Sequence, residues 1–285
     1  MVIDMHLHPI FYKAICEDPK ELAFRKDHFG VWKQGPMDWD EAFAEMDICG
    51  IGRSVMLPLD VTTTEGGWIV TNEQTALLEK LHPERMIGFA SVDPHRKDAE
   101  EVLIHAFDDL GLHGLCLHPA KQKFHPSDPG LEPIYRICEE RSLPVIFHAG
   151  MSWEPDTPSR YAHPLEFEEV LIRHPGLRCC LSHFAWPWVR EMVMLMIKYP
   201  NVYTDTSLLY LDSPEESMRR LFTEDMGPMW FERGFPKQVM FGSNTPRFRA
   251  FKLKRALDKV PMRESAREAL YSGTDGLSFY RVISR

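Results

Sequence analysis

Short apolar and β-branched runs alternate with longer amphipathic stretches along most of the chain. Eight of the runs have the length and composition of buried strands, and the stretches between them carry apolar residues at helical spacing. Strand and helix repeated in this order are typical of a (β/α)8 barrel, so we expect the TIM-barrel fold of the α/β class. The expected strands cover residues 2–8, 53–58, 86–91, 114–118, 144–148, 178–183, 201–206 and 238–243, and the expected helices cover residues 38–49, 72–81, 99–110, 131–140, 165–174, 188–199 and 251–257.

No linker-like segment interrupts this repeat, which predicts a single domain over residues 1–285. Segments rich in proline, glycine, aromatic and charged residues separate some of the runs. We expect them to be loop insertions at the C-terminal face of the barrel. They cover residues 11–36, 62–69, 124–130, 152–163 and 211–236.

Charge and cysteine usage narrow the range of functions. The net charge of −9 is spread along the chain without a basic stripe, which argues against nucleic acid and membrane partners and favours a small-molecule substrate. The six cysteines form no CxxC motif, as in proteins with free thiols, so we expect a cytoplasmic protein. No apolar run approaches the ~20 residues of a membrane span. Because an expected strand begins at residue 2, we expect no signal peptide.

A pair of histidines closes the first expected strand. His6 and His8 are separated by one residue, so alternation along a strand places them on one face, together with Asp4, about 7 Å apart. Two imidazoles at this spacing can bind one metal ion, although an isolated HxH motif has weak specificity.

Further polar residues follow other strands at the same end. His118, His148 and His183 end their strands, and Asn244 comes directly after the last one. Strand ends converge on one face of a (β/α)8 barrel, where the active sites of this fold lie. A single histidine at a strand end is usually a core residue, but this repeated placement indicates a metal site.

The chain resembles the amidohydrolase-related group of the amidohydrolase superfamily, which includes aminocarboxymuconate-semialdehyde decarboxylase. The resemblance covers nearly the whole chain and depends on short motifs that follow one another in the order of this group. They are IDMHLH at residues 3–8, IGFASVDP at 87–94, GLCLHP at 114–119, LPVIFHAG at 143–150, LSHF at 181–184, NVYTDTS at 201–207 and FGSNTP at 241–246.

This resemblance implies a site and a type of chemistry. It implies that His6, His8 and His148 bind one divalent metal ion, zinc or manganese, with further positions open to Asn244, and that His183 is a catalytic or water-orienting histidine. It also implies a hydrolase or a non-oxidative decarboxylase that acts on small carboxylated or aromatic substrates. Barrels of this group often dimerise, so a homodimer is a further expectation.

The sequence departs from the group at Asn244, where relatives carry aspartate. An amide oxygen can still coordinate a metal, but it carries no charge and is no base near pH 7. Three explanations stay open: a specialised chemistry, a barrel that binds a ligand without turnover, and an engineered Asp→Asn change that traps a ligand. The residue therefore puts hydrolysis by the usual route in doubt.

Other residues near the strand ends have candidate roles. Cys116 lies where relatives tend to carry lysine and shares a strand face with His118; it is either an additional metal ligand or a space-filling thiol. We expect His118, Trp186 and Arg247 to contact substrate, with Arg247 binding a carboxylate through its guanidinium group. We expect Asp205 to hold one of the histidines in place without itself contacting the metal.

Overall fold

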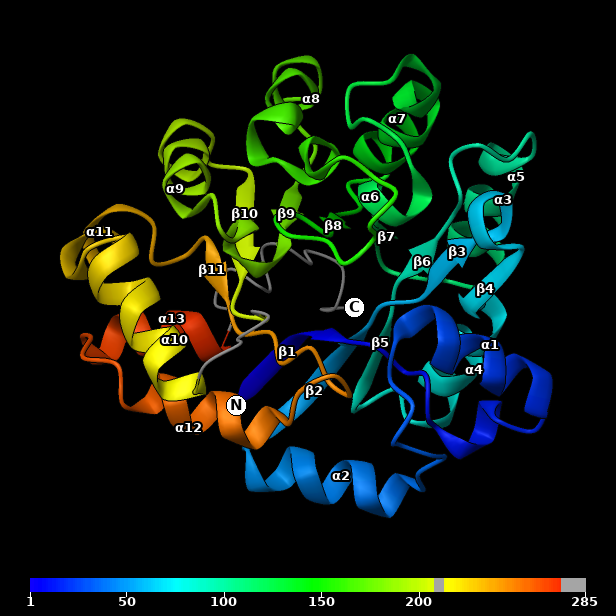
Figure 1. The fold of residues 1–285 in the computed structure, drawn as a ribbon, viewed down its shortest axis with the longest axis horizontal. Helices are drawn as coiled ribbons and strands as arrows, with labels where there is room; N and C mark the ends of the chain where they lie inside the picture. Colours follow the sequence, from blue (N-terminus) through cyan, green and yellow to red (C-terminus); the bar gives the residue numbers. More distant parts are fainter. Residues whose placement is uncertain (208–212, 273–285) are drawn as a thin grey trace.

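The computed structural model describes residues 1–207 and 213–272. The eight expected runs all form parallel strands, and the run at 86–91 is split into β5 and β6. Figure 1 shows these strands in an inner ring with the helices outside it. The strands are β1 (Val2–Leu7), β2 (Ile51–Met56), β5 (Met86–Gly88), β6 (Ala90–Ser91), β7 (Leu115–Leu117), β8 (Val145–Phe147), β9 (Cys179–Leu181), β10 (Val202–Asp205) and β11 (Val239–Met240).

Backbone hydrogen bonds close these strands into a barrel. The pairing runs β1-β2-β5 and β6-β7-β8-β9-β10-β11, and Phe89 joins the two groups because its amide donates to Met56 at 3.1 Å on the β2 side. At the other edge the amide of Met5 donates to the carbonyl of Phe241 at 2.9 Å, and the amide of His8 donates to Thr245 at 2.8 Å. The expected TIM-barrel fold is confirmed.

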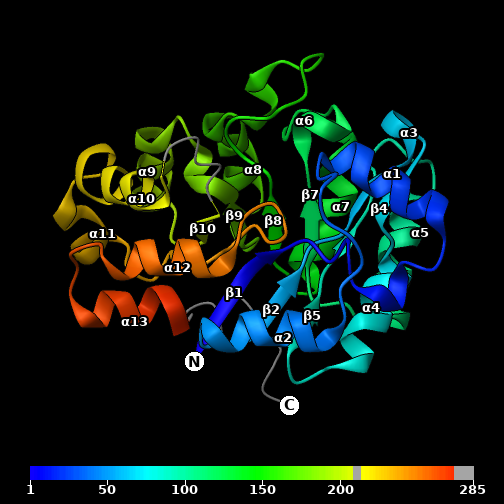
Figure 2. The same ribbon diagram turned by 60° about the horizontal axis from the view of Figure 1, so that its bottom comes forward.

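Seven helices follow the amphipathic stretches. Two of them begin at a capping box: Thr71 and Gln74 form one on α4, and Asp38 and Glu41 form one on α2. Figure 2 shows the helices packed along the outside of the strands. Their bounds are α2 (Trp39–Ile48), α4 (Asn72–Leu81), α5 (Ala99–Ile104), α7 (Glu132–Glu140), α8 (Glu168–Arg173), α9 (Val189–Lys198) and α12 (Ala250–Asp258).

Some segments expected to be loops contain regular structure. Residues 11–36 include α1 (Pro19–Phe29), which the Asp18 side chain caps and which ends at Gly30 with φ 73°. Proline is favoured at the first position of a helix as well as in loops, so a proline in this segment did not require a loop. The loop prediction was wrong there. The other additions are β3 (Leu59–Val61), α3 (Thr62–Glu65), β4 (Gly67–Val70), α6 (Pro119–Gln122), α10 (Pro214–Arg220), α11 (Pro228–Gly234) and α13 (Glu264–Ser272).

The barrel interior is filled by a cluster of buried apolar side chains. Ile3 and Met5 from β1 belong to this cluster, together with Cys116 from β7. The register between β1 and β2 shifts between Asp4 and Leu7, so β1 contains a bulge. This bulge turns His6 into the barrel after Met5, and Asp4 instead accepts hydrogen bonds from Ser243.

The expectation that Asp4 shares a face with the two histidines was therefore wrong. The sequence cannot reveal a bulge that depends on pairing with a distant strand. Among the described residues, no helix is long and apolar enough to span a membrane.

Candidate functional site

A cavity of about 550 Å³ opens at the C-terminal ends of the strands. Its volume falls in the range of small-molecule sites. The five histidines of the expected site and Asn244 all line it, so the structure brings them together. The lining residues from strand ends are His6, His8, Cys116, His118, His148, His183 and Asn244.

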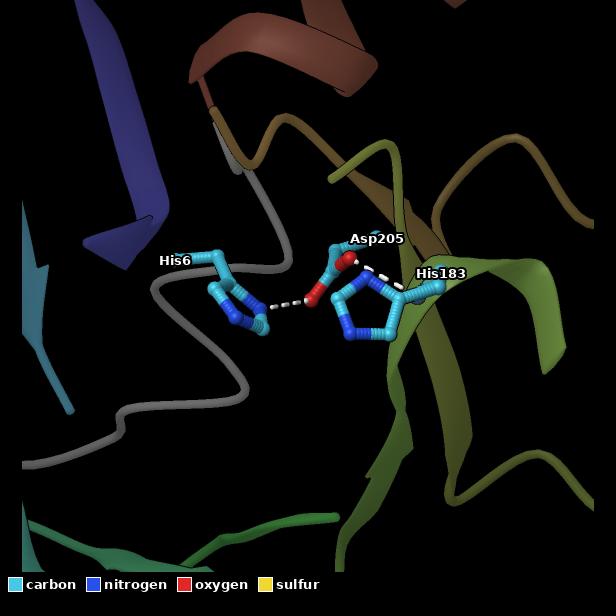
Figure 3. A group of neighbouring side chains, drawn as sticks. All are labelled: His6, His183 and Asp205. Carbon is cyan, nitrogen blue, oxygen red and sulfur yellow. Dashed lines mark hydrogen bonds and ion pairs between the residues drawn. The ribbon is translucent and has the colours of Figure 1, made fainter. Parts of the chain in front are cut away.

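His6 and His183 are both tied to one buried carboxylate, that of Asp205 at the end of β10 (Figure 3). The Nδ1 atom of His6 lies 3.0 Å from Oδ2 of Asp205, and the amide of His183 donates to Oδ1 at 3.0 Å. Burial acts to raise the pKa of Asp205, but His6 and the hydrogen bonds around it lower that pKa below its ordinary value. Asp205 is therefore ionised and orients His6, the role that the sequence suggested for it.

In four of the five histidines, namely His6, His8, His148 and His183, one ring nitrogen faces a hydrogen-bond acceptor of the protein. The Nδ1 atoms of His6 and His8 face Asp205 and the Leu57 carbonyl, at 3.0 and 3.1 Å. The Nδ1 atom of His183 lies 2.5 Å from the Ser207 carbonyl, and Nε2 of His148 lies 3.1 Å from the Met151 carbonyl. Since these oxygens only accept hydrogen bonds, the facing nitrogens carry the protons.

The remaining ring nitrogens point at one another in pairs. Nε2 of His6 lies 3.1 Å from Nε2 of His8, and Nε2 of His183 lies 3.1 Å from Nδ1 of His148. In neutral imidazoles these atoms hold lone pairs, and two lone pairs at this distance need a proton or a cation between them. Two imidazoles that bind one zinc ion through bonds of about 2.0–2.1 Å have a similar separation, so the donor set fits a divalent metal.

Burial keeps most of these imidazoles in the form that binds metals. It lowers the pKa of His8, His118 and His148 well below the ordinary value, and neighbouring cationic or histidine groups act in the same direction. Burial also lowers the pKa of His183 to about 4. The rings of these four histidines, His8, His118, His148 and His183, are neutral at pH 7, which is the state that a metal ion requires. His6, His183 and Asp205 offer donor atoms within 4.8 Å of one another.

Asn244 lines the cavity in a fixed position. Its backbone amide donates to the His6 carbonyl at 2.9 Å, its side-chain amide donates to the Ser207 carbonyl at 3.4 Å, and its φ is 59°. Asp205 does not replace the missing carboxylate on the cavity wall, because it is fully buried and its oxygens accept bonds from His6, His183 and Ser207.

The residues expected to contact substrate differ in their placement. His118 stacks on His148 with ring centroids 3.9 Å apart, and Arg247 packs over the Phe29 ring. Both line the cavity, whereas Trp186 is not among its lining residues and packs instead against the hydrophobic core. The turn at 183–185 has positive φ values, and this conformation, which sequence patterns do not reveal, precedes Trp186.

Cys116 is on the cavity wall, on the same side as His118, as strand alternation predicts. Burial raises the pKa of its thiol to about 12, and the side chain belongs to the apolar cluster inside the barrel. Of the two roles left open by the sequence, these observations favour the space-filling thiol.

Several lining residues were not singled out from the sequence. Trp32 and Trp153 provide the aromatic wall that Trp186 was expected to give, and Lys121 pairs with Glu154 inside the cavity. All four lie in α6 or in loop segments, where no periodic pattern indicates which side chain faces inward. Ser207 does not line the cavity, but its Oγ lies 2.8 Å from Nδ1 of His183. It lies two residues after the end of β10, and this position was the available signal.

Comparison with known proteins agrees with this geometry. The family profile of amidohydrolases matches residues 3–273. No curated protein sequence matches the chain significantly. Among solved structures, the uncharacterized TIM-barrel protein Bb4693 from Bordetella bronchiseptica is 22% identical with a TM-score of 0.75, over 98% of this chain and 99% of that chain.

Two enzymes have the same fold at lower similarity. The 4-oxalomesaconate hydratase from Rhodopseudomonas palustris is 20% identical with a TM-score of 0.66, over 99% of this chain and 96% of its own. A mutant 5-carboxyvanillate decarboxylase from Novosphingobium aromaticivorans DSM 12444, with bound manganese and 3-methoxy-4-hydroxy-5-nitrobenzoic acid, is 16% identical with a TM-score of 0.66, over 99% and 97%. The match to the family profile shows that this TIM-barrel chain belongs to the amidohydrolase family.

Proposed function

We propose that the protein is a metal-dependent enzyme that removes CO2 from a small aromatic carboxylate. The observation that carries this proposal is the pairing of Nε2 of His6 with Nε2 of His8 at 3.1 Å in the cavity. His6, His8 and His148 would hold the ion. When bound, a divalent metal supplies a positive charge that anchors the substrate and stabilises negative charge.

The protein's own residues support decarboxylation more than hydrolysis. Hydrolysis needs a base beside the attacking water, and Asn244 cannot accept that proton near pH 7. Asp205 has its oxygens occupied by His6, His183 and Ser207. Decarboxylation does not need that base: the C–C bond breaks, its electron pair stays on the ring carbon, CO2 leaves and the carbon takes a proton.

His183 is the residue positioned to deliver this proton. Its Nδ1 atom is held by Ser207, so only Nε2 faces His148 and the cavity. Burial lowers the pKa of His183 to about 4, and the negative charge of a bound carboxylate would oppose that effect. Substrate binding would therefore favour the protonated ring that the step requires.

The reactions of two enzymes with the same fold agree with this proposal. A decarboxylase and a hydratase of carboxylated compounds share the fold, and the decarboxylase structure contains manganese and an aromatic acid. The aromatic residues Phe29, Trp32 and Trp153 on the cavity wall suit a planar substrate.

The test is a panel of small aromatic acids, esters and lactones offered to the manganese- and zinc-loaded protein. CO2 release and hydrolysis are measured side by side, with His183→Ala as the inactive control. We expect CO2 release that His183→Ala abolishes. Hydrolysis without CO2 release would contradict the proposed reaction. Metal and ligand binding without turnover would instead identify a barrel that only binds.

A further inference from the structure

An ion pair lies on the wall of the cavity. The Nζ atom of Lys121 is 3.0 Å from Oε1 of Glu154, and the two side chains are only 11% and 17% exposed. Lys121 belongs to α6, which follows His118, and Glu154 lies between β8 and α8. Placing a lysine in this position has a desolvation cost, so we expect its positive charge to serve in binding a ligand.

The cation of the pair is held by a rigid part of the barrel. The backbone amide of Lys121 donates to Nδ1 of His118 at 3.1 Å. The next residue, Gln122, is fully buried and its side chain donates to the carbonyls of Asp60 and Val92 at 2.7 and 2.9 Å. These contacts fix α6 against the strand ends and therefore fix the position of Lys121.

The anion of the pair lies on a longer connection. Glu154 accepts hydrogen bonds from Lys121 and from the hydroxyl of Ser152, and no regular element covers residues 148–158. Glu154 can therefore move away more easily than Lys121.

Arg247 is a second cation of the same cavity. Its guanidinium packs over the Phe29 ring with Cζ 4.5 Å from the centroid, and Nη2 donates to the Phe29 carbonyl at 2.6 Å. Burial lowers the pKa of Arg247, and the charge of Glu154 acts in the opposite direction. The negative charge of Glu154 therefore acts on Arg247 as well as on its ion-pair partner Lys121.

The remaining acids of the wall have other partners. Glu65 pairs with His28 at 3.1 Å, Asp27 accepts from Trp32, and Asp156 pairs with Lys123. Glu154 is thus the carboxylate of the wall that pairs with Lys121.

From this arrangement we infer that Glu154 occupies the place of a substrate carboxylate, and that Lys121 binds a second carboxylate of the substrate. The ligand class is a planar aromatic dicarboxylate: one group reaches the histidines and the other displaces Glu154 from Lys121. This inference rests on the proposed function, because the first carboxylate needs the metal held by the histidines.

The exchange is favourable for a simple reason. A ligand carboxylate offers Lys121 the same charge-assisted hydrogen bond that Glu154 offers, and the displaced Glu154 regains contact with water. A ligand with one carboxylate gains no such bond. Selectivity for the second group should therefore depend on Lys121.

The experiment measures binding by calorimetry to the manganese-loaded protein, with benzoate and isophthalate as probes. We expect isophthalate to bind at least about tenfold more tightly than benzoate. Lys121→Met should remove that difference and leave benzoate affinity unchanged. Glu154→Gln should tighten isophthalate binding several-fold, because it frees Lys121 without deleting it.

Lys123→Met is the matched control. It removes the neighbouring pair with Asp156, whose side chains are 42% and 62% exposed, and should change neither affinity. Equal affinity for the two acids in the metal-loaded protein, or a Lys121→Met effect on both acids alike, would overturn this inference alone. Failure of the protein to bind manganese, counted beforehand by elemental analysis, would overturn the proposed function and this inference together.

Discussion

His6 and Asp205 are separated by 199 residues in the chain, yet Nδ1 of His6 lies 3.0 Å from Oδ2 of the buried carboxylate. This contact links β1 to β10, which lies on the other side of the β11 segment. It fixes the proton of His6 on Nδ1 and leaves Nε2 to face His8. The metal site thus depends on a residue that does not line the cavity.

Asp205→Asn tests this relationship. The amide keeps the shape but removes the charge that orients His6, so we expect metal affinity to fall about 10- to 100-fold. Competition with a fluorescent chelator gives the affinity. The control is Asp108→Asn, which removes an exposed ion pair with Arg141 and should leave affinity unchanged. Equal losses in both variants would contradict the role of Asp205.

Asn244→Asp tests the main departure from the family pattern. The change restores a negative charge and a proton acceptor beside the histidines, and general-base assistance is worth about 10²- to 10⁴-fold in rate. We expect tighter metal binding and at least about a tenfold gain in the hydrolysis of ester or lactone substrates. The comparison variant is Cys116→Ser, measured in the same assays.

The opposite result would identify a different site. If Asn244→Asp lowers activity and Cys116→Ser lowers it further, the site has been remodelled around the amide with Cys116 as a compensating anion. Unchanged activity in the parent and in both variants would favour a barrel that binds without turnover.

The buried cysteines predict how stability depends on alkaline pH. Burial raises the pKa of Cys138 to about 12 and that of Cys179 above its ordinary value. A thiol whose pKa is raised in the fold contributes full stability below its unfolded pKa, about 8.5, and loses it as pH rises further. We expect the free energy of unfolding in urea to fall as the pH rises from about 8.5 towards about 12, the unfolded and folded pKa values of Cys138. A constant or rising free energy over this range would contradict the assignment.

Gly150 predicts a stability effect next to the site. Its φ is 90°, and a side chain there would collide with the backbone of Ala185 and Trp186. We expect Gly150→Ala to lower stability by about 1–3 kcal/mol in urea unfolding. Gly130→Ala is the control, because a Cβ atom there meets nothing within 4 Å. A loss in Gly130→Ala as large as that in Gly150→Ala would show that the effect is not local.

Much of the barrel could be predicted from the sequence because buried parallel strands are continuous apolar runs and their polar ends are conspicuous. His118 and His148 lie where strand ends predicted them, on the cavity wall. The β1 bulge, which separates Asp4 from His6, could not be predicted because it depends on pairing with β2. The same limit applies to Trp186, whose direction is set by a turn, and to α1, whose composition is that of a loop.

The central claim is that the histidines at the strand ends hold one divalent ion. Elemental analysis of the purified parent, His6→Ala and His148→Ala tests it most directly, with His105→Ala as a control at an exposed histidine paired with Asp109. We predict about one equivalent of zinc or manganese in the parent and the control, and a loss of most of the metal in the other two. Equal metal in all four proteins would show that the ion binds elsewhere and would contradict the account.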